Sequence, residues 1–288
     1  MLQKLKAIIK LTRIEHSLII IIAILTSSAI SKSVSLSINY FLYFIPPILV
    51  SASSFIINDY FDVDVDRANK RNDRPLVNGS ISKKEALFYY NISVLISIIL
   101  ALYLNIYAML VIIAFILLAF LYSYKLKLIP LIGNIVIAST MAIPFIYGGL
   151  INGVRLDNTI LVISAIAFFY GMAREIQGVI RDYDGDKLRN VKSIAMIIGK
   201  RWAAALAFLM NLIAVVLSIY VFYYDPPYRS DIIYIYTISL VDIALLYISY
   251  IYIIRSKRLS KNLGKRLRDY TLALMFIASL LYMIIALF

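Results

Sequence analysis

Long, predominantly apolar stretches alternate with short charged segments along this chain of 288 residues. Nine such stretches cover residues 17–31, 38–57, 86–104, 106–124, 128–151, 157–173, 202–222, 232–254 and 270–288. Most of them reach the roughly 20 residues that a helix needs to cross the hydrocarbon core of a bilayer. The pattern therefore predicts an all-α polytopic membrane protein with nine transmembrane helices, organised as a single domain over residues 1–288.

Two boundaries in this pattern carry further information. The stretch 17–31 is short and follows Lys4, Lys6, Lys10 and Arg13, which is also the order of features in a signal peptide. Eight further spans follow it and no clear cleavage site does, so a spanning helix is the favoured interpretation. Asn105 is the only polar break between the third and fourth stretches, which predicts a tight hairpin there.

The composition supports a membrane protein and excludes some chemistry. Hydrophobic residues make up 62% of the chain and the mean hydropathy is +0.87, whereas soluble domains are nearer half apolar. The chain has no cysteine, which excludes disulfides, thiolate metal sites and cysteine nucleophiles.

The basic residues predict the orientation in the membrane. Of the 29 lysines and arginines, 26 fall in the N-terminal tail and in segments 58–85, 125–127, 174–201 and 255–268, which lie on one side of the nine predicted spans. Because basic residues concentrate on the cytoplasmic side, the N-terminus is predicted inside and the C-terminus outside. The net charge of +13 is thus a topology signal and does not indicate a nucleic-acid partner, and no obligate protein partner is evident.

Two aspartate clusters interrupt this apolar chain. The segment NDYFDVDVDRANKRNDRP begins at Asn58, and REIQGVIRDYDGDKLRN begins at Arg174. Asp62, Asp64 and Asp66 recur 120 residues later as Asp182, Asp184 and Asp186, and Gly79 and Gly199 have the same offset. Each cluster follows an even-numbered span, so the pattern predicts an internal repeat of about four helices.

Helix geometry sorts these acids by face, since residues three or four apart share a face and residues two apart do not. If the spanning helices continue into the clusters, Asn58, Asp62 and Asp66 share one face with Asp59 beside them, and Asp182 and Asp186 share another. Asp64 and Asp184 are expected to point elsewhere. Like charges stacked at this spacing repel, so each helix needs a cation between them.

The clusters allow three interpretations. Ordinary solvated loops explain one cluster more readily than two similarly placed ones. Calcium loops have the spacing of DVDVD and DYDGD, but Arg67 and Lys187 stand where glycine is required. Magnesium binds through a few carboxylates plus substrate phosphates, so two facing clusters would hold a diphosphate at the cytoplasmic interface while an apolar tail lies among the helices.

The motifs N-D-x-x-D-x-x-x-D at Asn58 and D-x-x-x-D at Asp182, with nine spans, resemble the UbiA superfamily of intramembrane prenyltransferases. The segments LTRIEHSL, RPLVNGSIS, LYSYKLKLIPLIGN and REI support the resemblance, which covers essentially the whole chain. Within the superfamily they are most similar to archaeal digeranylgeranylglyceryl phosphate synthases. Two departures stand out: His16 is found where asparagine is expected, and Gly178–Val179 where Lys-Asp is expected.

The resemblance implies a fold and a reaction. The fold would be nine helices around a central apolar cavity capped by cytoplasmic Asp-rich loops. The reaction would be Mg²⁺-dependent transfer of a geranylgeranyl group from geranylgeranyl diphosphate to the free hydroxyl of geranylgeranylglyceryl phosphate. The partners would be this prenyl diphosphate donor, a lipid-like phosphate acceptor and the surrounding membrane lipids. An aromatic acceptor such as 4-hydroxybenzoate is the alternative within the superfamily.

The same resemblance implies roles for individual residues. Catalysis would involve Asn58, Asp62, Asp66, Asp182 and Asp186, and the four aspartates among them would bind Mg²⁺. Substrate binding would involve Arg13, Asp59, Arg67, Arg74, Lys125, Asn134 and Arg174. Lys127, Arg181 and Lys187 are further candidates, because cations should meet the diphosphate as it gains charge on leaving.

A transporter is the remaining alternative outside the enzymes. Transporters usually carry ionisable residues or broken helices near the middle of the bilayer. Here Asp242 is the exception to span centres that are almost free of charge, and Pro144 predicts a kink. Because the charges gather at one interface instead, the pattern favours an enzyme acting on a headgroup.

Overall fold

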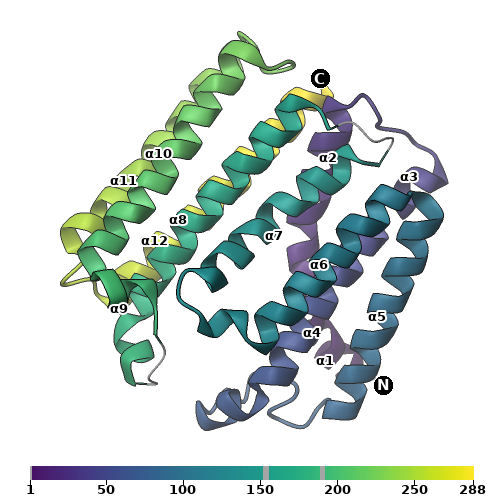
Figure 1. Ribbon diagram of the computed structural model, residues 1–288, viewed down its shortest axis with the longest axis vertical. Helices are drawn as coiled ribbons and strands as arrows, with labels where there is room; N and C mark the ends of the chain where they lie inside the picture. Colours follow the sequence, from purple (N-terminus) through teal and green to yellow (C-terminus); the bar gives the residue numbers. More distant parts are fainter. Residues whose placement is uncertain (1, 152–155, 189–191) are drawn as a thin grey trace. The chain divides into compact units, whose positions relative to one another are not determined.

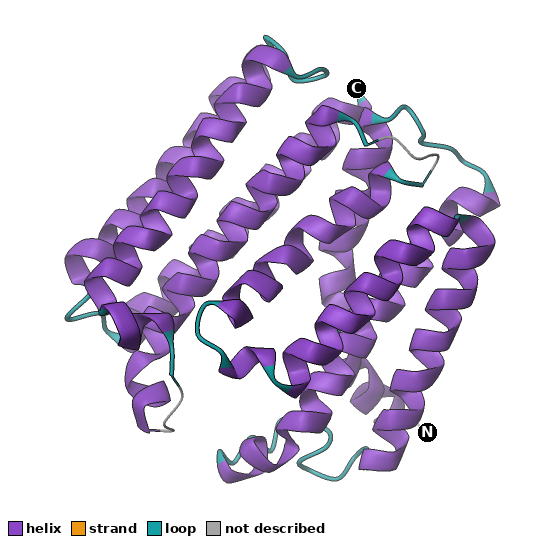
Figure 2. Ribbon diagram, in the orientation of Figure 1, coloured by secondary structure: helices purple, strands orange, loops and turns teal. Residues whose placement is uncertain are grey.

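The computed structural model describes residues 2–151, 156–188 and 192–288, without the side chains of residues 2, 185, 186 and 188. Within these ranges the chain is helical and contains no strand (Figures 1 and 2). The long helices are α4 (Ile45–Ala68), α5 (Lys83–Leu104), α6 (Ile106–Tyr124), α7 (Ile132–Gly149), α8 (Asn158–Leu188), α10 (Lys200–Tyr224), α11 (Ile232–Arg255) and α12 (Lys261–Leu287). The shorter ones are α1 (Leu2–Thr12), α2 (Ser17–Ile30), α3 (Ile38–Leu42) and α9 (Ile194–Ile198), with 3₁₀ turns η1 (Ile14–His16) and η2 (Leu126–Leu128).

Eight helices among the described residues are long and apolar enough to cross a membrane. The ninth predicted span, 17–31, corresponds to α2, which has 14 residues and is therefore only about 21 Å long. Eight of the nine predicted spans are therefore long enough to cross a membrane, and the first one, α2, is shorter than a full crossing. The prediction of Asp-rich loops is wrong, because α4 and α8 continue as helices through both aspartate clusters.

The predicted hairpin at Asn105 is present. Asn105 ends α5 in an extended conformation with φ −167°, and its side chain accepts a hydrogen bond of 2.7 Å from the Tyr107 amide at the start of α6. Its side-chain amide also donates to the carbonyl oxygens of Leu150 and Ile151, each at 3.2 Å. One residue therefore terminates one helix, begins the next and fixes their connection.

The described helices form two compact units. In the first, α4 packs against α1, α5 and α6. The amphipathic α1 places Ala7 and Leu11 in a core with Ile56 and Val63 of α4, while its lysines stay exposed. This packing attaches the N-terminal segment to the end of α4 that carries the first aspartate cluster.

In the second unit, the long helix α8 packs against α7, α10 and α12. Glycines allow the closest approaches: a Cβ at Gly171 would lie 2.8 Å from the Met141 sulfur, and one at Gly148 would lie 2.8 Å from the carbonyl oxygen of Ile24 in α2. Small residues permit such contacts between helices that have no hydrophobic driving force in lipid.

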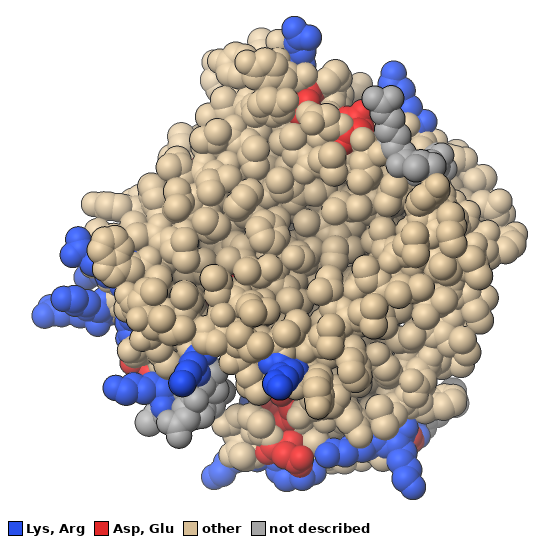
Figure 3. All heavy atoms as spheres, viewed as in Figure 1, with Lys and Arg blue, Asp and Glu red and all other residues tan. Residues whose placement is uncertain are grey.

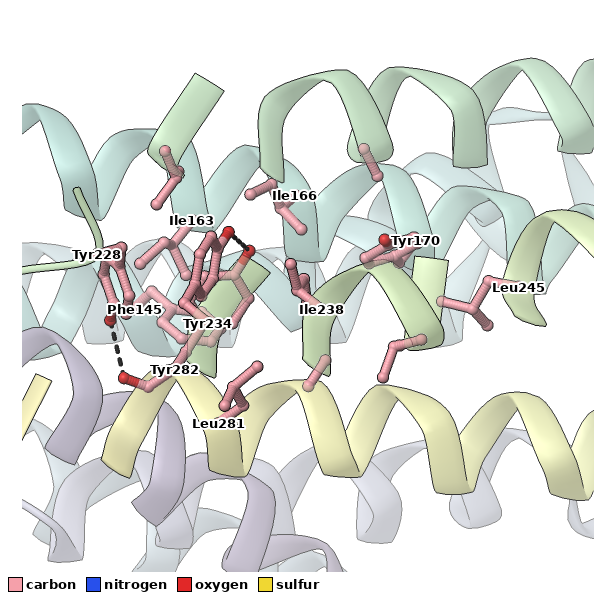
Figure 4. Close-up of a cluster of buried hydrophobic side chains, with 14 of the residues drawn as sticks. Phe145, Ile163, Ile166, Tyr170, Tyr228, Tyr234, Ile238, Leu245, Leu281 and Tyr282 are labelled. Atoms are coloured by element: carbon pink, nitrogen blue, oxygen red, sulfur yellow. Dashed lines mark hydrogen bonds between the residues drawn. The ribbon is translucent and has the colours of Figure 1, made fainter. Parts of the chain in front are cut away.

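Buried hydroxyl groups in the second unit hydrogen-bond to one another and to the backbone (Figure 4). Tyr228 donates to the Tyr282 carbonyl at 2.8 Å, and the Tyr234 and Tyr282 hydroxyls are 2.9 Å apart. Asp242 accepts hydrogen bonds from Tyr170 and Ser218. Asp242, the ionisable residue at a span centre, is thus part of the packing between α8, α10 and α11.

Candidate active site

The first aspartate cluster (Asn58, Asp59, Asp62, Asp64 and Asp66) lies on the last three turns of α4. Asn58, Asp62 and Asp66 are half-buried, whereas the Asp64 side chain is 74% exposed. Asp64 pairs instead with Arg67 at 3.2 Å and with Lys83 at 3.6 Å. The predicted division of the acids by helix face is therefore confirmed for this cluster, and Arg67 lies with the solvated acid.

Asp59 has a different environment from the other acids. Its side chain is 1% exposed and accepts from Arg13 at 2.9 Å and from Arg74 at 3.0 and 3.2 Å. The Arg13 guanidinium also lies 4.6 Å from the centre of the Phe55 ring, and Arg13 itself has a positive φ of 47°. Asp59 thus holds two arginines, one from the N-terminal segment and one from the loop after α4, so its oxygens are already engaged.

Asp62 and Asp66 have the character expected of magnesium ligands. They lie one turn apart on one face and are close enough to repel each other. The Arg74 Nε lies 3.8 Å from Asp66. Among the described residues no group of three or more acids or histidines is arranged around one point. Magnesium commonly takes only one or two carboxylates and completes its shell with water and substrate phosphates, so this pair fits that ion.

Outside the helices, the loop after the first cluster contains a further ion pair. Arg71 donates to both oxygens of Asp73 at 3.0 and 3.1 Å. These hydrogen bonds hold the pKa of Asp73 below its ordinary value. Both residues are exposed, so they keep the loop charged at neutral pH without adding to the buried site.

The second aspartate cluster (Asp182, Asp184 and Asp186) lies near the end of α8. Arg181 binds both oxygens of Asp182, with Nε and Nη2 distances of 2.9 and 2.6 Å. Asp184 is 80% exposed and pairs with Lys200 at 3.3 Å. The backbone of Asp186 continues the helix, and its side chain lies outside the described residues.

A cavity of about 250 Å³ opens beside Asp182 in the second unit. We call it the arginine cavity, and it is lined by Arg174, Glu175, Gly178, Val179, Arg181, Asp182 and Arg268. Arg174 donates to Glu175 at 2.8 Å, while its Nε is buried and has no hydrogen-bond partner among the described residues. Three guanidinium groups face two carboxylates here, so the cavity suits an anion.

Sequence reasoning missed Arg268, which belongs to α12, far along the chain from both motifs. The available signal was Lys261, Lys265 and Arg268 at positions i, i+4 and i+7, which places three basic residues on one helix face. Gly178 and Val179, which depart from the family pattern, line the cavity, and the nearest described atom to a Cβ at Gly178 is Arg181 Nη2 at 3.9 Å.

The two remaining predicted substrate-binding residues, Lys125 and Asn134, belong to different units. Lys125 ends α6 in the first unit and is exposed. Asn134 lies in the first turn of α7 in the second unit and is half-buried.

In Figure 3, most of the visible face carries neither basic nor acidic side chains, and the charged ones gather near its margins.

Comparisons with known proteins agree with this chemistry. The model of the UbiA prenyltransferase family matches residues 19–280. Digeranylgeranylglyceryl phosphate synthase of Archaeoglobus fulgidus is 35% identical over 249 residues, 85% of this chain and 84% of its own. The enzyme of the same name from Thermococcus gammatolerans is 31% identical over 86% of this chain and 87% of its own.

Two solved structures share the fold. A structure of digeranylgeranylglyceryl phosphate synthase in membranes is 27% identical, with a TM-score of 0.82 and coverage of 99% of both chains. A UbiA homologue from Archaeoglobus fulgidus bound to GPP and Mg²⁺ is 21% identical, with a TM-score of 0.68 over 98% of this chain and 99% of its own. The multi-pass helical architecture is therefore that of a known group of integral membrane proteins.

Proposed function

We propose, since the chain belongs to the UbiA prenyltransferase family, that it transfers a geranylgeranyl group from geranylgeranyl diphosphate to geranylgeranylglyceryl phosphate. The observation that carries this proposal is the extent of similarity to the digeranylgeranylglyceryl phosphate synthases, which spans most of this chain and most of theirs. The half-buried acids at the end of α4 and the arginine cavity beside α8 supply the charge that two phosphorylated substrates require.

In this proposal Asp62, Asp66, Asp182 and Asp186 are the residues that would hold Mg²⁺ with the donor diphosphate, and Asn58 would assist from the same face of α4 as Asp62 and Asp66. When bound, the metal acts as a Lewis acid that stabilises charge on the departing diphosphate. Arg74, held beside Asp66 by Asp59, adds a fixed positive charge on the same side of the helix. Preorganised charges of this kind stabilise the charge that develops in the transition state.

The bond changes balance without a further co-reactant. The allylic C1–O bond of the donor breaks, and its electron pair leaves with the diphosphate. The acceptor hydroxyl oxygen then forms an ether bond to C1 and loses its proton. The products are the diether phosphate, diphosphate and one proton, so the protein has to bind, orient and exclude water around the allylic cation.

The test is product identification with purified membranes that contain the protein. Geranylgeranyl diphosphate, geranylgeranylglyceryl phosphate and Mg²⁺ should give the diether phosphate by mass spectrometry, and removal of Mg²⁺ with a chelator should stop its formation. Preferential prenylation of 4-hydroxybenzoate in a competition assay would contradict the proposed acceptor while leaving the family assignment intact.

A further inference from the structure

The arginines of the cavity have more N–H donors than their ion pairs with neighbouring carboxylates use, so donors remain for an anion. A guanidinium carries five N–H donors. Arg174 uses one towards Glu175, Arg181 uses two towards Asp182, and Arg268 uses two towards the exposed Asp269. Each arginine therefore keeps donors for a ligand, and the Arg174 Nε is buried without a described partner.

The wall that α12 contributes is specifically basic. Lys261, Lys265 and Arg268 lie on one face of α12, with Gly264 between them. A Cβ at Gly264 would lie 2.7 Å from the Arg181 Cγ, so this face is in direct contact with Arg181 of α8. Lys261 and Lys265 are exposed, so a row of positive charge leads from solvent to the cavity.

The size and charge of the cavity fit a headgroup. A volume of about 250 Å³ is below the range of about 300–1,000 Å³ usual for drug-sized ligands, so it accommodates a phosphate with its glycerol but not a prenyl chain. A phosphate monoester carries about −1.5 to −2 charges at neutral pH. A guanidinium group can donate two parallel hydrogen bonds to the oxygens of one phosphate, so a cluster of arginines is well suited to bind this group.

We propose that the arginine cavity binds the phosphate group of the lipid acceptor, with Arg268 of α12 as one of its ligands. This inference rests on the proposed function and names the residues that would recognise the acceptor. The donor diphosphate is assigned to carboxylates through Mg²⁺, and one of these, Asp182, also lines the cavity. The three cavity arginines each have one carboxylate partner, and Lys261 and Lys265 on the same side of α12 add positive charge beyond these pairs, which suits an anion that carries no metal. An acceptor with a phosphate would then be selected over one with a free hydroxyl in its place.

Kinetics with Arg268→Ala test this assignment. Loss of hydrogen bonds to a charged group predicts an increase of about 10-fold to 100-fold in the KM for geranylgeranylglyceryl phosphate. The KM for geranylgeranyl diphosphate should change by less than about 2-fold, since the donor is assigned to carboxylates through Mg²⁺ and the described hydrogen bonds of Arg268 go to Asp269 and not to those carboxylates. Arg268→Lys should be intermediate, because lysine retains the charge but not the bidentate geometry. Arg266→Ala, on an exposed face of the same helix, is the matched control and should match the wild type.

Two kinetic outcomes would overturn the inference. An Arg268→Ala enzyme that behaves like Arg266→Ala would show that Arg268 does not bind substrate. A raised KM for the donor with an unchanged KM for the acceptor would assign the cavity to the diphosphate.

A binding assay separates this inference from the proposed reaction. Because the chain has no cysteine, Lys265→Cys introduces one thiol at the mouth of the cavity. Geranylgeranylglyceryl phosphate should slow its alkylation by a maleimide, whereas the same lipid without phosphate should not, and Arg266→Cys should be unaffected by either. Protection in a protein that transfers no prenyl group would retain the cavity assignment and reject the proposed function. Prenyl transfer without protection of the thiol would support the proposed function and reject the cavity assignment.

Discussion

Asp59 and Asp64 lie five residues apart on α4 and have opposite environments. The Asp59 side chain is 1% exposed and neutralised by two arginines, whereas that of Asp64 is 74% exposed. Removing one partner of a buried ion pair leaves uncompensated charge, but exposed pairs contribute little. The two aspartates therefore have different roles: Asp59 neutralises two arginines in a buried place, and Asp64 pairs with exposed cations at the surface.

The first prediction compares these two positions. Asp59→Asn should lower the free energy of unfolding by about 3 kcal/mol, because Arg13 and Arg74 lose their shared carboxylate. Asp64→Asn, the matched control, should change it by less than about 1 kcal/mol. Thermal unfolding of the purified proteins in detergent measures both, and equal melting temperatures would show that the Asp59 pairs do not stabilise the first unit.

The second prediction concerns turnover. Asp62→Ala, Asp66→Ala, Asp182→Ala and Asp186→Ala should each reduce Mg²⁺-dependent transfer by about 100-fold or more, since each removes a proposed metal ligand. Asp64→Ala and Asp184→Ala should retain most activity, because both side chains point to solvent. Initial rates at matched protein levels decide the matter, and an equal loss at all six positions would reject the assignment by helix face.

The sequence predicted the residues of this site unevenly. Periodicity separated Asp64 from Asp62 and Asp66, because helix geometry alone determines which side chains share a face. It could not predict that Asp59 holds Arg13 and Arg74, since those contacts join three segments of the chain. Arg268 could not be identified from the sequence, because a single arginine in the basic segment 255–268 cannot be distinguished from the basic residues that set the orientation in the membrane.

At the scale of helices, hydropathy located most elements but misjudged where two of them end. The segments 106–124 and 232–254 agree with α6 and α11 to within one residue. The helices α4 and α8 extend past their apolar portions, because charged side chains project into water from the same backbone that crosses the bilayer. A hydropathy boundary therefore marks where the membrane ends and not where the helix ends.

A third prediction tests the close packing of helices in the second unit. Gly148→Ala would place a Cβ 2.8 Å from the Ile24 carbonyl oxygen and 2.9 Å from its Cα, and backbone atoms cannot yield as a flexible side chain can. The expected destabilisation is about 1–3 kcal/mol. Gly178→Ala, whose nearest neighbour would be 3.9 Å away, is the stability control and should be unchanged or more stable by up to about 1 kcal/mol in thermal unfolding, because alanine is the better helix former. A similar loss in both variants would show that the contact with Ile24 is not the cause of the destabilisation.

At the scale of the whole molecule, the number of spans decides which side the C-terminus occupies. The apolar segment Ile14–Ile30 is shorter than the other candidates, but η1 and α2 together extend about 27 Å, close to the roughly 30 Å of a bilayer core. With this segment counted there are nine crossings, and without it there are eight.

The fourth prediction follows from the distribution of basic residues. We expect a cytoplasmic N-terminus, an active site facing the cytoplasm and a C-terminus outside. An alkaline phosphatase fused after Phe288 should be active and a fluorescent protein fused there should be dark. The opposite pattern would mean that the segment Ile14–Ile30 does not cross the membrane.

The carboxylate shared by Arg13 and Arg74 also has an evolutionary consequence. A lineage that lost one of the three charges would leave the others unbalanced in a buried place, so single changes should be selected against while paired changes survive. Positions 13, 59 and 74 should therefore covary across the family, whereas position 64 should drift independently of all three. An alignment of relatives could detect this coupling without any experiment on the protein itself.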